Sequence, residues 1–217
     1  MTASGRMSEL STRRLRADDA ADVIAAADLL CRGGLVAFPT DTVYGLGTTV
    51  WDAPAVARIF AAKQRPSEKA IPVLLADFDG AGALVDDLPA GLVELAARFW
   101  PGALTLVAVA RQTVPEIVTA GTGTVALRVP DHPVTLALLR RTGPLAVSSA
   151  NRSGLESPVS AAEVLVQLDG RIDAVLDGGR CPGGQPSTVV DLTQSPPQVV
   201  RCGPISEQAI RMVLAGQ

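Results

Sequence analysis

The chain has 217 residues, of which 47% are hydrophobic, and its formal net charge is -3. A chain of this length and composition can bury the core of one α/β domain, and its acidic balance argues against a surface built as a whole to hold nucleic acid. No apolar stretch follows the N-terminal arginines and no later segment has about 20 uninterrupted apolar residues, so we expect neither a secretory signal nor a membrane span, and a cytoplasmic location.

We expect residues 1–14 to be disordered or poorly ordered and residues 15–217 to form a single domain, since no long linker or repeat interrupts them. Residues 17–32 carry apolar side chains at mostly helical spacing, with aspartates early and two glycines directly after, which predicts a helix. The apolar run 35–38, stopped by Pro39, predicts a buried strand.

Helices and strands then alternate along the chain. Apolar spacing predicts helices over 52–62 and 90–99. Ser160 and Glu163 have the spacing of a capping box, which predicts a helix that starts at Ala161, and a last helix is expected after Ser206. Short apolar runs predict strands over 71–75, 104–108, 125–129, 145–147, 174–176, 188–191 and 198–201. The alternation indicates an α/β fold, and the neighbouring strands near the end indicate a sheet that is not purely parallel.

The segment from Phe38 to Gly47 ends a strand in clustered hydroxyls, followed by two glycines. Two interpretations remain open for it. The hydroxyls hold a small polar ligand while the glycines let the backbone approach that ligand, or the Thr and Asp side chains satisfy the amides of an ordinary turn.

Three cations lie just beyond the second predicted helix, namely Lys63, Arg65 and Lys69, and Pro66 prevents further helix. One or two of them would complement the helix C-terminus, whereas all three together suit a polyphosphate or carboxylate ligand. The chain has neither a Walker phosphate loop nor a GxGxxG motif that opens a helix.

Two further polar segments border predicted strands. In residues 121–130, hydroxyl side chains precede a strand that ends with an arginine. Residues 148–154 follow the strand 145–147, and either a ligand site or a hydrogen-bonded turn fits there. His132 is the only histidine and has no nucleophile elbow beside it, so we interpret it as a loop or helix-start residue. The cysteines lack metal-ligand spacing and are expected to be reduced thiols; they are Cys31, Cys181 and Cys202.

Read in order, seven segments resemble the YrdC-like threonylcarbamoyl-AMP synthase family: GGLVAFPTDTVYGLG, KQRPSEK, FWPGALTLV, GTVALRVPDHP, SSANRSG, PSTVVD and RCGPI. The resemblance covers nearly the whole chain and is to the short, single-domain form. It implies a twisted mixed α/β sheet flanked by helices, with a concave, positively lined cavity. It also implies a nucleotidyltransferase that joins L-threonine, bicarbonate and ATP into threonylcarbamoyl-AMP and releases pyrophosphate, the first step of threonylcarbamoyladenosine formation in tRNA.

Matching positions in the family pattern imply roles for individual residues. Lys63 and Arg65 are expected to be catalytic by offsetting the charge of carbamate and phosphates. The resemblance implies that L-threonine is bound by Thr42, Arg128, Val147 and Ser187, that ATP is bound by Arg65, Lys69, Thr124, Ser149, Ser157 and Arg201, and that support comes from Thr40, Tyr44 and Asn151. ATP is expected to carry Mg²⁺, because no carboxylate cage for a metal is evident.

The chain departs from the family pattern at Ala70 and Leu74, where many members have a proline and a histidine, so a threonine contact by that histidine is in doubt here. The resemblance implies a downstream tRNA threonylcarbamoyl transferase as a partner and at most a weak contact with tRNA. It implies no interaction with a membrane. Two other functions stay open: a non-catalytic RNA-binding module, which the acidic charge and scarce aromatic residues disfavour, and a related carbamoyl-adenylate enzyme with another acceptor.

Overall fold

The computed structural model describes residues 11–216. Its helices are α1 (Ala20–Cys31), α2 (Ala53–Lys63), the 3₁₀ helix η1 (Asp79–Ala83), α3 (Ala90–Phe99), α4 (Glu116–Thr119), α5 (Pro133–Thr142), α6 (Ala161–Leu168) and α7 (Glu207–Leu214). Its strands are β1 (Arg13–Arg16), β2 (Val36–Phe38), β3 (Gly45–Thr49), β4 (Val73–Leu74), β5 (Leu104–Val109), β6 (Thr124–Arg128), β7 (Leu145–Ser149), β8 (Ala174–Asp177), β9 (Thr188–Asp191) and β10 (Gln198–Arg201).

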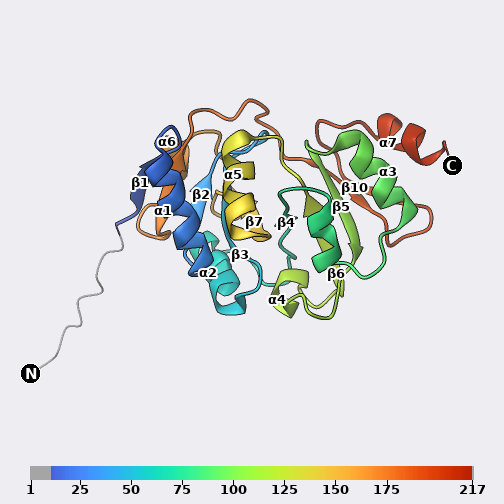
Figure 1. The fold of residues 1–217 in the computed structure, drawn as a ribbon, viewed down its shortest axis with the longest axis horizontal. Coiled ribbons are helices and arrows are strands. Elements are labelled where there is room, and N and C mark those ends of the chain that lie inside the picture. The colour runs from blue at the N-terminus through green and yellow to red at the C-terminus, as the bar shows by residue number, and fades with distance from the viewer. Residues whose placement is uncertain (1–10, 217) are drawn as a thin grey trace, which may run out of the picture.

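The ten strands of residues 11–216 join one sheet in the order β1-β8-β2-β3-β7-β4-β6-β5-β9-β10, and Figure 1 shows β1 and β10 at its opposite ends. The sheet contains parallel pairs such as β4 with β6 and antiparallel pairs such as β5 with β6. The predicted α/β class with a mixed sheet is therefore confirmed.

Most predicted helices begin where the sequence places a capping residue. The Ser160 hydroxyl accepts from the Glu163 amide at 3.3 Å, and the Glu163 carboxylate reaches back to the Val159 amide at 2.8 Å. Ser206 caps α7 through the amide of Ala209 in the same way. Such caps satisfy amides that the first turn of a helix leaves free, so these predicted starts are confirmed.

Several elements differ from the prediction. The expected strand 71–75 is reduced to β4, and β1, β3, α4, α5 and η1 were not expected. Of the segment 1–14, expected to be poorly ordered, residues 1–10 lie outside the described residues, whereas Arg13 and Arg14 belong to β1 and pair with β8. The ordered domain thus includes residues before the expected start at Leu15.

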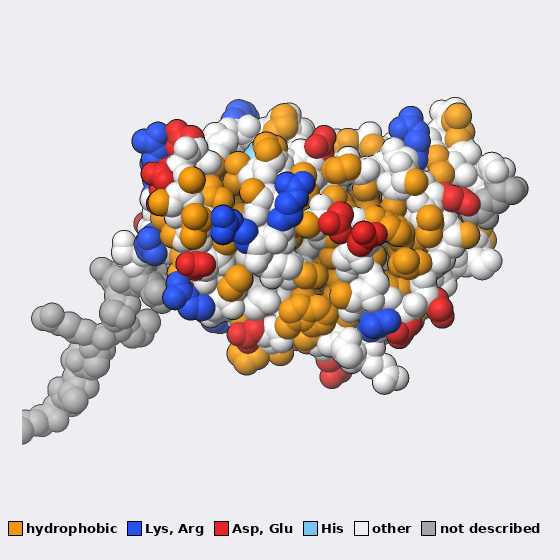
Figure 2. Space-filling model, in the orientation of Figure 1, with side chains coloured by type: hydrophobic (Ala, Val, Ile, Leu, Met, Phe, Trp, Pro, Cys, Tyr) orange, Lys and Arg blue, Asp and Glu red, His pale blue; other side chains and the backbone are white. Residues whose placement is uncertain are grey.

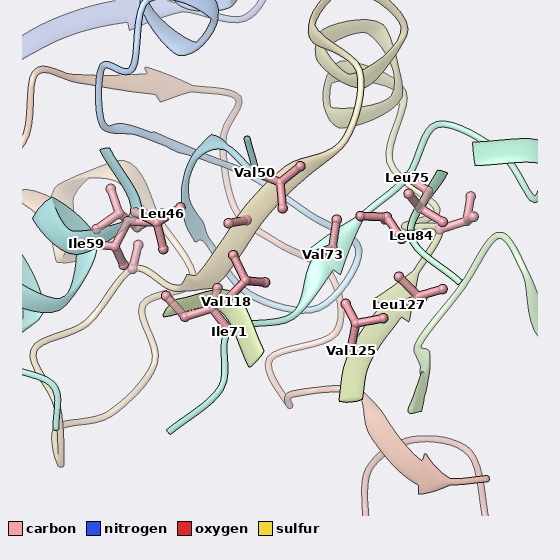
Figure 3. Packing of buried hydrophobic residues seen from close by; sticks show 14 of the residues in the cluster. Leu46, Val50, Ile59, Ile71, Val73, Leu75, Leu84, Val118, Val125 and Leu127 are labelled. Carbon is pink, nitrogen blue, oxygen red and sulfur yellow. The ribbon is translucent and has the colours of Figure 1, made fainter. Parts of the chain in front are cut away.

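The two faces of the sheet carry two hydrophobic clusters, because successive strand residues point to opposite sides. Leu145 and Val147 of β7 belong to the cluster that α1 and α5 cover, whereas Ala146 between them belongs to the other. The second, larger cluster is covered by α2, α3, α4 and α6. Figure 3 shows part of it, with Val73 of β4 close to Val125 and Leu127 of β6.

The face under α1 and α5 is only partly covered. These two helices pack over β2, β8 and β7. Leu127 of β6 and Leu104 and Leu106 of β5 point into the opposite cluster. Their strand neighbours Arg128 and Thr105 therefore lie on the same face as α1 and α5, beyond the part that these helices cover. That uncovered part of the sheet forms the floor of the cavity described below. Within residues 11–216 no helix combines the length and apolarity needed to cross a bilayer.

Candidate functional site

A cavity of about 400 Å³ lies on the uncovered part of the sheet. Its floor comes from β7, β4, β6, β5 and β9, and its walls come from the turn 40–45 and from loops that follow strands and helices. The predicted site residues that line it are Thr40, Thr42, Tyr44, Arg65, Arg128, Val147, Ser149, Ser157, Ser187 and Arg201. Lys63, Lys69, Thr124 and Asn151 are not in the lining.

The hydroxyls of the turn after β2 form a chain that ends on Arg128. Thr40 Oγ1 donates to the carbonyl of Val43 at 2.7 Å, so it accepts in its 2.9 Å contact with Thr42 Oγ1. Thr42 Oγ1 in turn accepts from Arg128 Nη1 at 3.0 Å. Thr40 also accepts from the amides of Thr42 and Val43, so the turn satisfies its own amides and orients a cavity arginine at once.

Arg128 is held on three sides and is only 6% exposed. Its Nε donates to the carbonyl of Gly102 at 2.9 Å, and Nη2 pairs with the Asp41 carboxylate at 2.5 Å. Burial lowers the pKa of Arg128, and the adjacent Asp41 opposes that shift. A guanidinium has five N–H groups, so two remain for a ligand. Sequence reasoning missed Asp41, although it lies between the two threonines that it predicted.

Arg201 and Ser187 form the neighbouring wall. Arg201 Nε donates to the carbonyl of Ser187 at 2.9 Å, and Nη2 donates to its hydroxyl at 3.0 Å. Ser187 Oγ also lies 2.7 Å from Oγ1 of Thr105, a lining residue that sequence reasoning missed. Burial and then the nearby charge of Arg128 lower the pKa of Arg201. We call Thr42, Thr105, Arg128, Ser187 and Arg201 the Arg128 end of the cavity.

Arg65 marks the other end, which we call the Arg65 end together with Lys69, Ser149 and Ser157. Gln64 ends α2 in the left-handed conformation, with φ of 51°, and so turns the chain toward the cavity. Arg65 Nη2 donates to the carbonyl of Ala70 at 2.9 Å, and burial lowers the pKa of Arg65. Lys69 is exposed on the same loop, and Thr124 is on the cavity face of β6 at its start.

Lys63 lies behind the Arg65 end and is 1% exposed. Its Nζ donates to the carbonyls of Ser149 and Asn151, and the Ser153 amide donates to the Lys63 carbonyl at 2.8 Å. Burial and the charge of Arg65 lower the pKa of Lys63 to about 7. Because even a neutral amine has two N–H groups for two carbonyls, Lys63 ties the end of α2 to the loop after β7 in either protonation state.

Asn151 and Tyr44 also act on the scaffold of the cavity. The Asn151 Nδ2 group donates to the carbonyls of Arg152 and Leu155 at 2.9 and 2.8 Å, which closes the loop after β7. The Tyr44 hydroxyl donates to the carbonyl of Gly179 at 2.7 Å, its ring lies in the larger core cluster, and burial raises its pKa to about 12.

Glycines on β3 make room for the Val147 side chain in the cavity wall. A Cβ atom at Gly45 would lie 2.7 Å from Val147 Cγ1, and one at Gly47 would lie 3.0 Å from Cγ2. Both distances are shorter than side chains normally allow, so these positions favour glycine for packing.

The charge of the lining is one-sided. Three arginines line the cavity, and within the described chain its lining includes no Asp or Glu side chain. His132 lies outside the lining as the residue before α5, so of its two interpretations, loop or helix start, the structure supports the helix start. The cysteines are free thiols, and no group of three or more potential metal ligands occurs among residues 11–216. The three arginines give this lining a positive charge, which suits anionic ligands.

Comparisons with known proteins agree with one another. A family model labelled Sua5_yciO_yrdC and described as telomere recombination matches residues 28–203. A Pyrococcus abyssi protein named threonylcarbamoyl-AMP synthase is 43% identical over 190 residues, which are 87% of this chain and 56% of that protein. A Mycobacterium tuberculosis H37Rv protein named putative threonylcarbamoyl-AMP synthase is 42% identical over 192 residues, 88% of either chain.

A solved structure of Pyrococcus abyssi Sua5 complexed with L-threonine has the same fold. It superposes with a TM-score of 0.89 at 40% identity, covering 94% of this chain and 60% of that one. The chain therefore spans little more than half the length of its Pyrococcus relative.

Proposed function

Because the chain belongs to the Sua5_yciO_yrdC family, we propose that it is a threonylcarbamoyl-AMP synthase, which converts L-threonine, bicarbonate and ATP into threonylcarbamoyl-AMP and pyrophosphate. The observation that carries this proposal is that one cavity has hydroxyls and two arginines at one end and a cationic loop at the other. Its volume of about 400 Å³ is within the usual range for small-molecule sites.

The Arg128 end binds the amino acid in this proposal. The two free N–H groups of Arg128 suit a carboxylate, which takes both oxygens in a bidentate pair. Thr42, the wall around Val147 and Ser187 complete that end. Asp41 keeps the guanidinium in one orientation, so that less side-chain freedom is lost when the substrate binds.

ATP binds toward the Arg65 end and reaches Arg201 across the floor. Arg65 and Lys69 balance phosphate charge, and hydroxyls of Thr124, Ser149 and Ser157 donate to phosphate or ribose oxygens. Mg²⁺ arrives on the phosphate oxygens of ATP. Lys63 contributes by fixing the loop of Ser149, since its amine already bonds two carbonyls there.

The reaction then needs positioning more than acid–base chemistry. The threonine nitrogen forms a bond to the carbon of bicarbonate with loss of water, which gives a carbamate. A carbamate oxygen forms a bond to the α-phosphorus of ATP while the α–β phosphoanhydride bond breaks, and pyrophosphate leaves with the electron pair. The arginines offset the charge that gathers on the transferred and leaving groups. We place this reaction in the cytoplasm, where a separate tRNA transferase uses the product.

The two alternative functions receive less support. Figure 2 shows positive and negative side chains interspersed on the viewed face, without the single-sign field that an RNA surface favours. A related enzyme with another acceptor would keep the Arg65 end and change the Arg128 end. Whether pyrophosphate release depends on L-threonine therefore distinguishes the two enzymes.

The test measures pyrophosphate release from ATP and bicarbonate with L-threonine, with L-serine and without an amino acid. We expect release that depends on L-threonine, and Arg65→Ala lowers kcat/KM by about 100-fold or more while the fold is kept. Arg211→Ala is the matched control, because Arg211 is exposed on α7 and its ion pair in the described part of the chain is with Glu207. Release without threonine favours the other acceptor, and RNA binding without turnover favours the RNA module. Unchanged activity in Arg65→Ala removes the cation cluster from the mechanism.

A further inference from the structure

Thr105 is a cavity residue to which neither the family resemblance nor the motifs give a role. Leu104 and Leu106 on either side of it point into the core, so the alternation of β5 turns the Thr105 hydroxyl to the cavity. The residue is 2% exposed, and the only hydrogen-bond partner of its hydroxyl within residues 11–216 is the Ser187 hydroxyl at 2.7 Å. A buried hydroxyl that faces a cavity needs its proton satisfied.

One of the two hydroxyl protons of this Thr105–Ser187 pair has no acceptor within residues 11–216. Arg201 can only donate, so Ser187 Oγ is the acceptor in its contact with Nη2. Thr105 and Ser187 have two hydroxyl protons between them, and their mutual contact uses one of them. Within the described chain no protein atom accepts the other. Whichever hydroxyl donates to its neighbour, one proton is left for an oxygen in the cavity.

The position of this proton relative to Arg128 suggests which oxygen receives it. Leu127 pairs with Leu106 in the antiparallel register of β5 and β6, which brings Thr105 beside Arg128 on the cavity face. On the other side of Arg128, Leu74 is its register partner on β4. A carboxylate held at Arg128 therefore has a hydroxyl pair on one flank and an apolar side chain on the other.

We propose that Thr105 and Ser187 together read the side-chain hydroxyl of the amino-acid substrate, while Leu74 contacts its methyl group. The inference rests on the proposed function and deepens it, because the two substituents on the threonine Cβ then meet surfaces of matching polarity. A substrate of the same shape without the hydroxyl leaves that proton of the Thr105–Ser187 pair without an acceptor. A site built to hydrogen-bond a substrate hydroxyl strongly rejects such an analogue. Leu74, where many relatives have histidine, then makes the methyl side of the pocket apolar.

The experiment compares kcat/KM for L-threonine and L-valine, since valine replaces the hydroxyl by a methyl of similar size. In Thr105→Val or Ser187→Ala one hydroxyl proton remains, so we expect the threonine-to-valine ratio to fall by less than about 10-fold. The double variant has no such proton, and its ratio falls by about 100-fold or more. Thr48→Val is the matched control, because Thr48 is a fully buried strand threonine whose hydroxyl has no partner in the described chain; it leaves the ratio unchanged.

A measurement on the unmodified chain keeps the test independent of whether the double variant folds. L-allo-threonine exchanges the two substituents, so its hydroxyl faces Leu74, and we expect its kcat/KM to be at least about 10-fold below that of L-threonine. Equal use of the two diastereomers, equal use of threonine and valine, or an unchanged ratio in the folded double variant overturns the inference and leaves the proposed function intact. Absence of threonine-dependent pyrophosphate release in the unmodified chain overturns the proposed function itself.

Discussion

The two ends of the cavity are built in different ways. At the Arg128 end, Thr42, Arg128 and Ser187 lie on or beside strands, are at most 6% exposed, and bond to other side chains. At the Arg65 end, the Arg65 side chain bonds, among residues 11–216, only to backbone carbonyls of its own loop, and Lys69 is exposed. One end is therefore organised before a ligand arrives, whereas the other end leaves its cations available to it.

This difference matches what each end is proposed to hold. A small amino acid offers few contacts, so its selection requires donors that are already fixed in place. A triphosphate offers many charged oxygens, so cations on a loop suffice to hold it. Substitutions at the two ends should consequently separate into those that cost stability together with activity and those that cost activity alone.

The largest effect is expected for Arg128→Met, which leaves the Asp41 carboxylate, whose side chain is only 13% exposed, without its partner. We expect the free energy of unfolding to fall by about 3–5 kcal/mol, because an unpaired buried charge is costly, and threonine-dependent turnover to be lost. Urea unfolding and pyrophosphate release measure the two effects. The double variant Asp41→Asn/Arg128→Met should recover part of the stability and none of the activity. A loss below about 1 kcal/mol in the single variant would show that this end is not held by the ion pair.

A smaller effect, dependent on pH, is expected at Lys63, which joins the two loops of the Arg65 end. Its folded pKa of about 7 lies below the ordinary value of 10.5, so below pH 7 both states are protonated and the folded state bears the full cost of a buried ammonium. Between pH 7 and pH 10.5 the folded state has released a proton that the unfolded state keeps, so stability rises with pH by up to about 1.4 kcal/mol per unit.

Urea unfolding of the unmodified chain and of Lys63→Met at pH 6.5 and pH 9 checks this expectation. The difference in the free energy of unfolding between the two proteins cancels the groups that titrate equally in both. We expect the unmodified chain to gain stability relative to Lys63→Met between pH 6.5 and pH 9. A difference that does not change with pH would mean that the ammonium stays charged between its two carbonyls.

The fold was predictable where local pattern and burial agree. Strands β9 and β10 were predicted with the bounds that the structure has, and the capped helix α6 begins at Ala161 as predicted. β3 was missed because Gly45–Thr49 has no apolar alternation, and its pairing with β2 and β7 comes from the tertiary structure. β1 was missed because Leu15 is its only buried residue, and the strand exists through its register with β8.

The site was predictable as a set of residue types but not as a network. The segments indicated hydroxyls and arginines, whereas the pairing of Arg128 with Asp41 joins residues far apart in the chain, which no local pattern reveals. The position of Lys63 had a local signal that was overlooked. Lys63 continues the buried stripe of Val56 and Ile59 on α2 at helical spacing, which predicts a side chain that points into the interior.

The smallest effect is expected for Lys69→Ala, which removes the most exposed cation of the Arg65 end. Lys69 makes no side-chain bond within the described chain, so its contribution to ATP binding is a screened attraction, and we expect KM for ATP to rise by less than about 5-fold. The rise should vanish at high salt, whereas the defect of Arg65→Ala should persist because Arg65 is half-buried. Glu68→Gln is the matched control on the same loop and should lower KM slightly, since it removes a negative charge. A Lys69 effect as large as that of Arg65 and insensitive to salt would mean that the loop closes over the nucleotide and that this end becomes as buried as the other.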